Sequence, residues 1–196
     1  MPITNGYCTL TEFKEAFGIE STDPTRDLVI SDIITDVSRE IDNYCRRQFY
    51  STTSSIRYFK AASRRMVLID DCTAITALAT DDGNYNYPYT WTASDYFAMP
   101  TGSLPYTWLE AKNLGAYAFP LLTNGVKVTA TWGYCATGEQ PAPIRRACLL
   151  QANRIYERRK AAFGVTSVSD IAPMTVIPID NDVTRFLTPY VKEWIG

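Results

Sequence analysis

Residues 24–47, PTRDLVISDIITDVSREIDNYCRR, carry a long helical pattern without an internal proline or glycine, and the rest of the predicted fold is built around it. At 100° per residue, its large apolar side chains fall on one broad face and its charged side chains fall opposite. The apolar face holds Ile30, Ile33, Ile34, Val37, Ile41 and Tyr44, and the polar face holds Asp32, Thr35, Asp36, Arg39, Asp42 and Arg46. Asp23-Pro24 offers an N-cap followed by proline at the first helical position. The stretch predicts an amphipathic helix that packs along one side and faces water along the other.

A shorter helix is predicted before this stretch. Thr9 and Glu12 have the spacing of a capping box, in which the hydroxyl and the carboxylate each accept from the other residue's backbone N–H. Gly18 is the expected stop.

The helical period gives way to short β-rich runs between residues 54 and 134. These runs are residues 56–59, 66–69, 74–79, 87–92 and 126–132. In the last run, Val126, Val128, Ala130 and Trp132 alternate with polar residues, which is typical of a strand with one buried face. Turn signals at residues 81–84 and 100–105 favour hairpins over helical crossovers.

A third helical pattern runs from Pro141 through Phe163, and Gly164 is its stop signal. Residues 165–179 contain two prolines and little charge, which predicts an extended arm. Residues 180–195 predict a final helix with a kink or a new N-cap at Thr188, the residue before Pro189.

Together these patterns predict an α+β protein: a small helical bundle with a β-rich insertion between the second and third helices and an extended C-terminal arm. We expect residues 1–50 to form the N-terminal part of the bundle and residues 51–140 the insertion. Residues 141–164 form the third helix in this interpretation, and residues 165–196 form the arm with its terminal helix. A chain of 196 residues with 46% apolar content can bury such a core.

Composition argues against several classes of function. The chain has no histidine, which removes the usual proton-transfer side chain, and its glycines form no phosphate-binding loop. Its five cysteines lack a C-x-x-C pair, so we expect free thiols in a reducing compartment and no metal or other cofactor. A net charge of -2 disfavours tight nonspecific DNA binding. No apolar run approaches the ~20 residues that cross a bilayer, and no signal peptide is visible, so we expect no membrane contact and a cytoplasmic site of synthesis.

The pairs Asp70-Asp71 and Asp81-Asp82 are the candidates for acid–base or divalent-ion chemistry. Adjacent strand residues point to opposite faces, which works against both uses. Solvated turn residues are therefore the favoured interpretation, and a histidine-free hydrolase is the alternative.

The third helix carries a local surplus of positive charge. Arg146, Arg154, Arg158 and Lys160 form either a solvated face or a contact with acidic subunits or passing DNA. Arg159 lies near the middle of the apolar face, so it is the basic residue most expected to meet a carboxylate at an interface. A DNA-binding module that uses residues 143–163 stays open as an alternative.

The C-terminal segment has apolar side chains that need a partner surface. The residues concerned are Phe186, Leu187, Pro189, Tyr190 and Trp194. They either pack back on their own domain or anchor the chain to another protein. In the second case, a chain without residues 165–196 should stay folded and fail to bind that protein.

Several strings resemble the head–tail connector (adaptor) proteins of tailed bacteriophages, a family also found in gene transfer agents. They are residues 9–18 with Ile41-Asp42-Asn43-Tyr44-Cys45, Trp132-Gly133-Tyr134, Pro143-Ile144-Arg145 through Arg159, and Phe186-Leu187-Thr188-Pro189-Tyr190. Val191 departs from the pattern, because an arginine often follows that tyrosine in the family.

The resemblance implies a non-enzymatic structural subunit of the virion neck, assembled in the host cytoplasm. It implies a ring of twelve copies that docks on the portal protein and meets a stopper or tail-completion protein below. Arg159 and the apolar C-terminal residues are the expected portal and subunit contacts.

Overall fold

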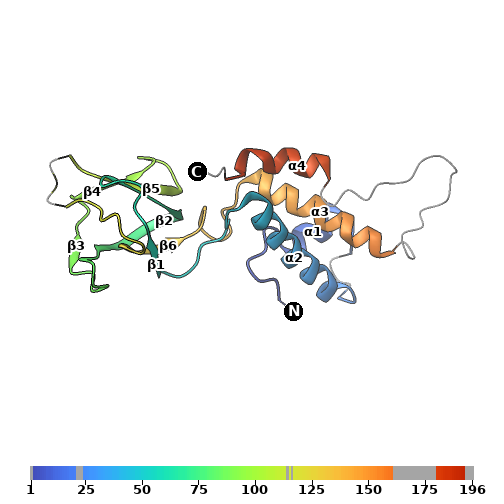
Figure 1. Cartoon of the computed structure of the whole chain (residues 1–196). Helices are drawn as coiled ribbons and strands as arrows, with labels where there is room; N and C mark the ends of the chain where they lie inside the picture. Colours follow the sequence, from blue (N-terminus) through green and yellow to red (C-terminus); the bar gives the residue numbers. More distant parts are fainter. Residues whose placement is uncertain (1, 21–23, 114, 116, 161–179, 193–196) are drawn as a thin grey trace. The chain divides into compact units, whose positions relative to one another are not determined.

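The computed structural model describes residues 2–20, 24–113, 115, 117–160 and 180–192 (Figure 1). The chain divides into two compact units, which we call the helical unit (residues 1–47 and 140–196) and the sheet unit (residues 48–139). The described residues form four α-helices and a six-stranded antiparallel sheet. The predicted α+β class is therefore confirmed.

The first helix, α1, spans Leu10–Ala16 and begins where the capping box predicts. The Glu12 N–H donates to the Thr9 hydroxyl over 3.1 Å, and the Thr9 N–H donates to the Glu12 carboxylate over 2.8 Å. Gly18 follows the helix with φ of +64°, a conformation that glycine adopts at little cost.

The long helix α2 spans Asp27–Cys45. It starts later than the sequence predicts, with Arg26 in the cap position, and Asp23 lies outside the described residues. Its buried apolar residues are Ile30, Ile34, Val37, Ile41 and Cys45, which confirms the predicted apolar face. Arg46 ends the helix in a left-handed conformation.

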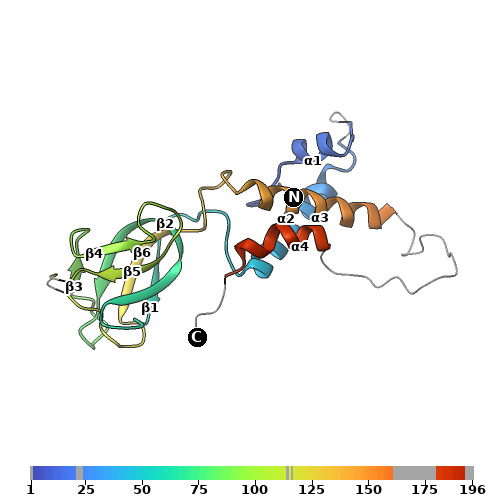
Figure 2. The same cartoon turned by 90° about the horizontal axis from the view of Figure 1, so that it is seen from above.

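Helix α3 spans Ala142–Lys160, α4 spans Asn181–Leu187, and a 3₁₀ turn, η2, covers Thr188–Tyr190. The predicted break at Thr188 is confirmed, because the α-helix gives way to η2 there. The predicted end of the third helix at Gly164 and the arm at 165–179 lie outside the described residues. Figures 1 and 2 show α2, α3 and α4 side by side, and each of these helices contacts the other two.

The strands of the sheet unit are β1 (Ser55–Phe59), β2 (Met66–Thr80), β3 (Tyr89–Trp91), β4 (Tyr96–Met99), β5 (Tyr106–Ala111) and β6 (Val126–Trp132). Their order is β1-β6-β2-β5-β4, and β3 pairs with β2. Residues 66–69 and 74–79 were predicted as two strands, which is wrong, because both belong to β2. The register of β2 shifts near Cys72 and again between Ile75 and Ala77. Strands β4 and β5 were not predicted.

The core of the sheet unit lies under β6 and β2. Val126, Val128, Ala130 and Trp132 are all buried, which confirms the alternation read from the sequence. Trp132 donates from its indole nitrogen to the Ser55 carbonyl over 2.9 Å, and Trp91 stacks on Phe119 at 4.5 Å. These contacts give the sheet unit an aromatic core of its own.

Candidate assembly interface

The C-terminal helix packs against its own unit. Leu187 is 0% exposed, and Val183 beside it is also buried. The Lys192 N–H then donates to the Cys45 carbonyl over 2.9 Å, which holds the chain after η2 against the end of α2. The sequence left open whether this segment packs on its own chain or on another protein. Helix α4 packs on its own chain.

This packing corrects one expectation. Removing residues 165–196 would take Val183 and Leu187 out of the core of the helical unit, so the truncated chain should not be expected to stay folded. Pro189 is exposed, and Phe186 and Tyr190 are half-buried, so these three offer surface to a partner. Trp194 lies outside the described residues.

Part of the positive charge of α3 is compensated within the helical unit. Arg145 forms an ion pair with Glu12, and Arg154 forms one with Asp180 at 2.9 Å. Arg146, Arg158 and Arg159 have exposed side chains, and nothing is described for the side chain of Lys160. Two arginines of α3 therefore form ion pairs within the helical unit, and three others are exposed to solvent.

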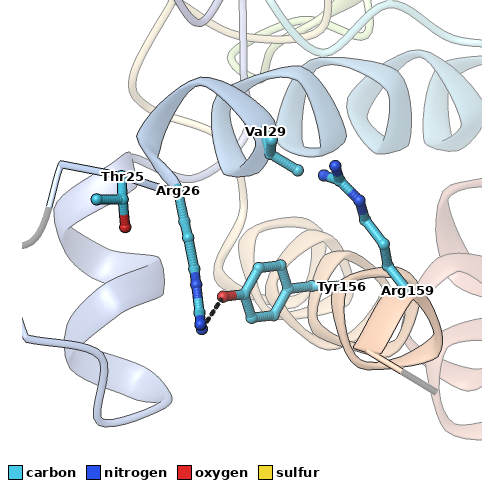
Figure 3. Close-up of a pocket in the computed structure, with 5 residues that line it drawn as sticks. All are labelled: Thr25, Arg26, Val29, Tyr156 and Arg159. Carbon is cyan, nitrogen blue, oxygen red and sulfur yellow. Dashed lines mark hydrogen bonds between the residues drawn. The ribbon is translucent and has the colours of Figure 1, made fainter. Parts of the chain in front are cut away.

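Arg159 lines a pocket of about 280 Å³ between the start of α2 and the end of α3 (Figure 3). Thr25, Arg26 and Val29 come from the α2 side, and Tyr156 and Arg159 come from α3. Arg26 donates from Nη1 to the Tyr156 hydroxyl over 3.0 Å. We call this the Arg26/Arg159 pocket.

The pocket combines two guanidinium groups with apolar walls. Figure 3 shows Tyr156 between Arg26 and Arg159, with Val29 facing the same space. The Tyr156 ring is buried and packs edge-on against Phe13, with 5.8 Å between ring centres. The neighbouring carboxylate, Asp27, pairs with the buried Lys14 amine at 2.5 Å. Such a site suits a carboxylate on a short apolar stem, because arginine binds carboxylates in a planar, two-pronged geometry.

Arg159 was predicted as a contact residue, whereas Arg26 was not. The predicted helix start at residue 24 made Arg26 an ordinary helical residue, and its partner Tyr156 is 130 positions away in the chain. A pairing over that separation leaves no local pattern in the sequence.

A second exposed surface lies on the sheet unit. Ile56 and Tyr58 project from the exposed face of β1, and the Tyr58 ring lies 5.4 Å from that of Tyr87. The amine of Lys127 lies 5.5 Å from the centre of the Tyr87 ring. Aromatic side chains such as tyrosine are enriched where proteins meet.

The aspartate pairs do not form a common acidic site. Asp70 is exposed on β2 and pairs with Arg57 at 2.6 Å, whereas Asp71 is buried at 6% exposure. Asp81 is 5% exposed and accepts from the backbone N–H groups of Gly83 and Asn86 over 3.0 and 3.1 Å. The prediction of solvated turn residues is therefore right for Asp82 and wrong for the buried Asp71 and Asp81. Asp70 is exposed, as predicted, but it lies in β2 and not in a turn. Across the described parts of the chain, no three His, Cys, Asp or Glu side chains gather as metal ligands.

The five cysteines are free thiols, as predicted. The sulfurs of Cys8 and Cys148 lie 3.6 Å apart in the core of the helical unit. The hydrogen bond to Cys148, together with burial, raises the pKa of Cys8 well above its usual value. Within the described residues, none of the helices has the length and apolar character to cross a membrane.

No protein family and no curated protein matches the chain in sequence. Solved structures match it in fold along its whole length. A chain in the neck of an empty GTA particle computed with C6 symmetry is similar with a TM-score of 0.62 and 17% identity, over 100% of this chain and 96% of that one.

Two further structures match over the same shares of both chains. They are the neck of a native GTA particle computed with C12 symmetry (TM-score 0.59, 16% identity) and the virion of a native gene transfer agent (GTA) particle (TM-score 0.60, 18% identity). At these identities, the likeness establishes a shared fold that includes both units.

Proposed function

We propose that this chain is a structural, non-enzymatic subunit of the neck of a phage or phage-like particle. The observation that carries the proposal is the match in fold, which covers 100% of this chain and 96% of a chain from a GTA neck. A helical bundle alone recurs in proteins of many functions. A bundle interrupted by a six-stranded sheet between its second and third helices is more specific, and the match extends over both parts.

In the finer form of this proposal, the subunit forms an adaptor ring of twelve copies. The ring docks on the portal protein and joins the DNA-filled head to the stopper or tail. Necks solved with C6 and C12 symmetry support a cyclic arrangement of this kind.

The exposed side chains of the helical unit support a role in binding. Pro189 and Tyr190 follow a helix that is anchored in the core, so they are presented on a rigid support. We propose that these residues and Phe186 contact the portal, and that Arg159 contacts a neighbouring subunit. In this account Leu187 acts indirectly, by holding α4 in place.

The DNA-binding and hydrolase alternatives gain no support from the described residues. Arg145 and Arg154 are already paired with carboxylates, which weakens the positive field of α3. Asp70 and Asp71 differ in environment, one exposed beside Arg57 and one buried.

The decisive experiment removes the gene from its phage or particle-producing genome. DNA-filled heads should accumulate without tails, and supplying the full chain should restore tailed particles. Native mass spectrometry of the purified chain with the portal protein of the same genome should show a complex with a fixed number of copies. Normal tailed particles in the deletion strain would contradict the proposal.

A further inference from the structure

The sheet unit has two outer faces, because its strands form two layers around one core. One half of β2 pairs with β5, which pairs with β4, and the other half pairs with β6, which pairs with β1. The inward side chains of both layers join one buried cluster, with Val67 and Leu109 from one layer and Val128 and Trp132 from the other. Figure 1 shows β4 and β5 above β1 and β6 within the sheet unit. The outward side chains of the two layers therefore point away from each other.

The outer face of the layer with β5 is apolar, and we call it the Trp108 face. It consists of two rows that run across the strands: Leu68, Trp108 and Met99 in one row, and Met66, Glu110 and Phe97 in the other. Phe97 is 49% exposed, and Met66 and Leu68 are also exposed. Trp108 lies between two of these strands' apolar side chains, and a tryptophan at the centre of an exposed apolar patch is typical of a protein contact site.

The outer face of the layer with β6 combines large and small side chains, and we call it the Lys127 face. It also has two rows: Ile56, Thr129 and Ala77 in one row, and Tyr58, Lys127 and Ala79 in the other. Ile56 and Tyr58 on β1 are 49% and 47% exposed. The alanines on β2 are small, so they leave room beside β1 for the large side chains of a partner.

We infer that the Trp108 face of one copy packs on the Lys127 face of the next copy, an inference that rests on the proposed function. Each face has a charged side chain on the middle strand of one row, and the two charges are opposite: Glu110 on the first face and Lys127 on the second. Packing the two faces row against row brings these charges together inside an apolar contact.

Both charged groups are available for this pairing. Glu110 lies 3.7 Å from Arg65, but both side chains are largely exposed, at 42% and 50%, and such a pair contributes little to stability. The amine of Lys127 lies 5.5 Å from the centre of the Tyr87 ring, and among the residues that the structure describes it has no carboxylate partner. A second cation, Lys112, lies at the rim of the Trp108 face, 4.7 Å from the centre of the Phe97 ring.

The contact joins two different faces on opposite sides of one unit, so it is a head-to-tail contact. Head-to-tail contacts generate closed rings when the rotation between copies divides a full turn evenly. One repeated contact then covers both apolar faces of every copy. Another virion protein is the competing occupant, but it would cover one face and leave the other in water. The two faces together therefore favour a second copy of this chain.

Photo-crosslinking in assembled particles identifies the occupant of the Trp108 face. Benzoyl-phenylalanine in place of Phe97 in the full chain should link to β1 or β6 of a second copy, giving a product of twice the chain mass whose linked peptides mass spectrometry identifies. Benzoyl-phenylalanine in place of Leu28, an exposed apolar residue of the helical unit, is the matched control and should give no link to those strands.

The other crosslinking outcomes are equally decisive. A link from position 97 to a different virion protein, or no link at all, would overturn the inference and leave the proposed function intact. A chain that is absent from purified particles would reject the proposed function itself.

Substitutions test whether both faces are needed. Phe97→Gln and Ile56→Gln should each weaken self-association in the presence of portal protein by about tenfold or more, equivalent to ~1.4 kcal/mol, as measured by sedimentation velocity. Leu28→Gln is the control and should leave self-association unchanged. Both positions are exposed, and circular dichroism checks that the variants fold. Wild-type strength in both variants, or wild-type copies that bind portal singly, would overturn the inference.

Mixing the two variants distinguishes a head-to-tail contact from a symmetric one. Phe97→Gln keeps its Lys127 face and Ile56→Gln keeps its Trp108 face, so the mixture should form mixed dimers by native mass spectrometry and no rings. Dimers of either variant alone would show a symmetric contact and contradict the inference. Glu110→Lys and Lys127→Glu should each weaken the contact, and the double variant should restore it. A double variant that stays dissociated would show that these two charges do not meet.

Discussion

Gly133 occupies a backbone position that no other residue fits well. Its φ is +140°, and a Cβ atom there would lie 2.2 Å from the Tyr50 carbonyl oxygen. The Gly133 N–H also donates to the Asp71 carbonyl over 2.7 Å, so the backbone cannot easily move away. The close contact of Gly133 with the Tyr50 backbone therefore holds the chain in place directly after β6.

We predict that Gly133→Ala destabilises the sheet unit by more than about 2 kcal/mol, because strain and a backbone clash add together. Gly138→Ala is the control, since Gly138 also has a positive φ but has open space around its Cα. Gly138→Ala should lower the free energy of unfolding by about 1 kcal/mol. Urea unfolding followed by tryptophan fluorescence measures both, and equal midpoints for the two variants would refute the prediction.

Cys45 gives a prediction about alkaline pH. Burial, with a smaller effect of Asp42, raises the pKa of its thiol from 9.0 to about 12. The folded state therefore favours the neutral thiol, and this stability is fully present below pH 9 and is lost as the pH rises towards 12. Wild-type protein should lose more stability between pH 8 and pH 10.5 than Cys45→Ala does. The slope of unfolding free energy against pH is the measurement, and parallel curves for the two proteins would contradict it.

Among the elements, α1 depends on its cap. Removing the Thr9 hydroxyl leaves the Glu12 N–H without its acceptor and frees a carboxylate that also pairs with Arg145 of α3. We predict that Thr9→Ala lowers the free energy of unfolding by about 1 kcal/mol. Thr11→Ala, an exposed change inside the same helix, should be neutral or slightly stabilising. Thermal unfolding followed by circular dichroism compares them, and an equal loss in both variants would argue against the cap.

The segment from α4 to η2 contains both a structural residue, Leu187, and a candidate contact residue, Tyr190. Leu187→Ala should cost about 2–5 kcal/mol, because it opens a cavity in a fully buried site. Tyr190→Ala should change stability much less and should weaken binding to portal protein. Unfolding curves and a pull-down with portal test the two variants together. Portal binding at wild-type strength by Tyr190→Ala would exclude this residue from the contact.

The whole molecule consists of two units with separate cores, and only the helical unit is discontinuous in sequence. The two ends of the sheet unit lie close together, because the Tyr134 N–H donates to the Gln48 carbonyl over 2.7 Å and Thr137 contacts Ser51. An insertion with adjacent ends can be cut out without straining either part.

We therefore predict that residues 48–139 fold when produced alone. The fragment should show dispersed amide signals by NMR and cooperative thermal unfolding followed by tryptophan fluorescence. Trp132→Ala in the same fragment should abolish the transition, since this ring fills its core. A fragment that is disordered at neutral pH would show that the sheet unit needs the helical unit to fold.

Features that depend on neighbours a few residues apart were predicted from the amino-acid sequence alone. The capping box at Thr9, the apolar face of α2, the alternation along β6 and the break at Thr188 were all predicted correctly. Each is a local pattern, because helix and strand periods repeat within two to four residues.

The segments that meet across long stretches of chain became known from the folded molecule. It joined residues 66–80 into one strand, buried Asp71 and Asp81, placed Arg26 beside Tyr156 and packed Leu187 against its own unit. Burial and pairing depend on contacts between residues far apart in the chain, such as Arg26 and Tyr156, which are 130 positions apart. No local pattern records the energy of such contacts.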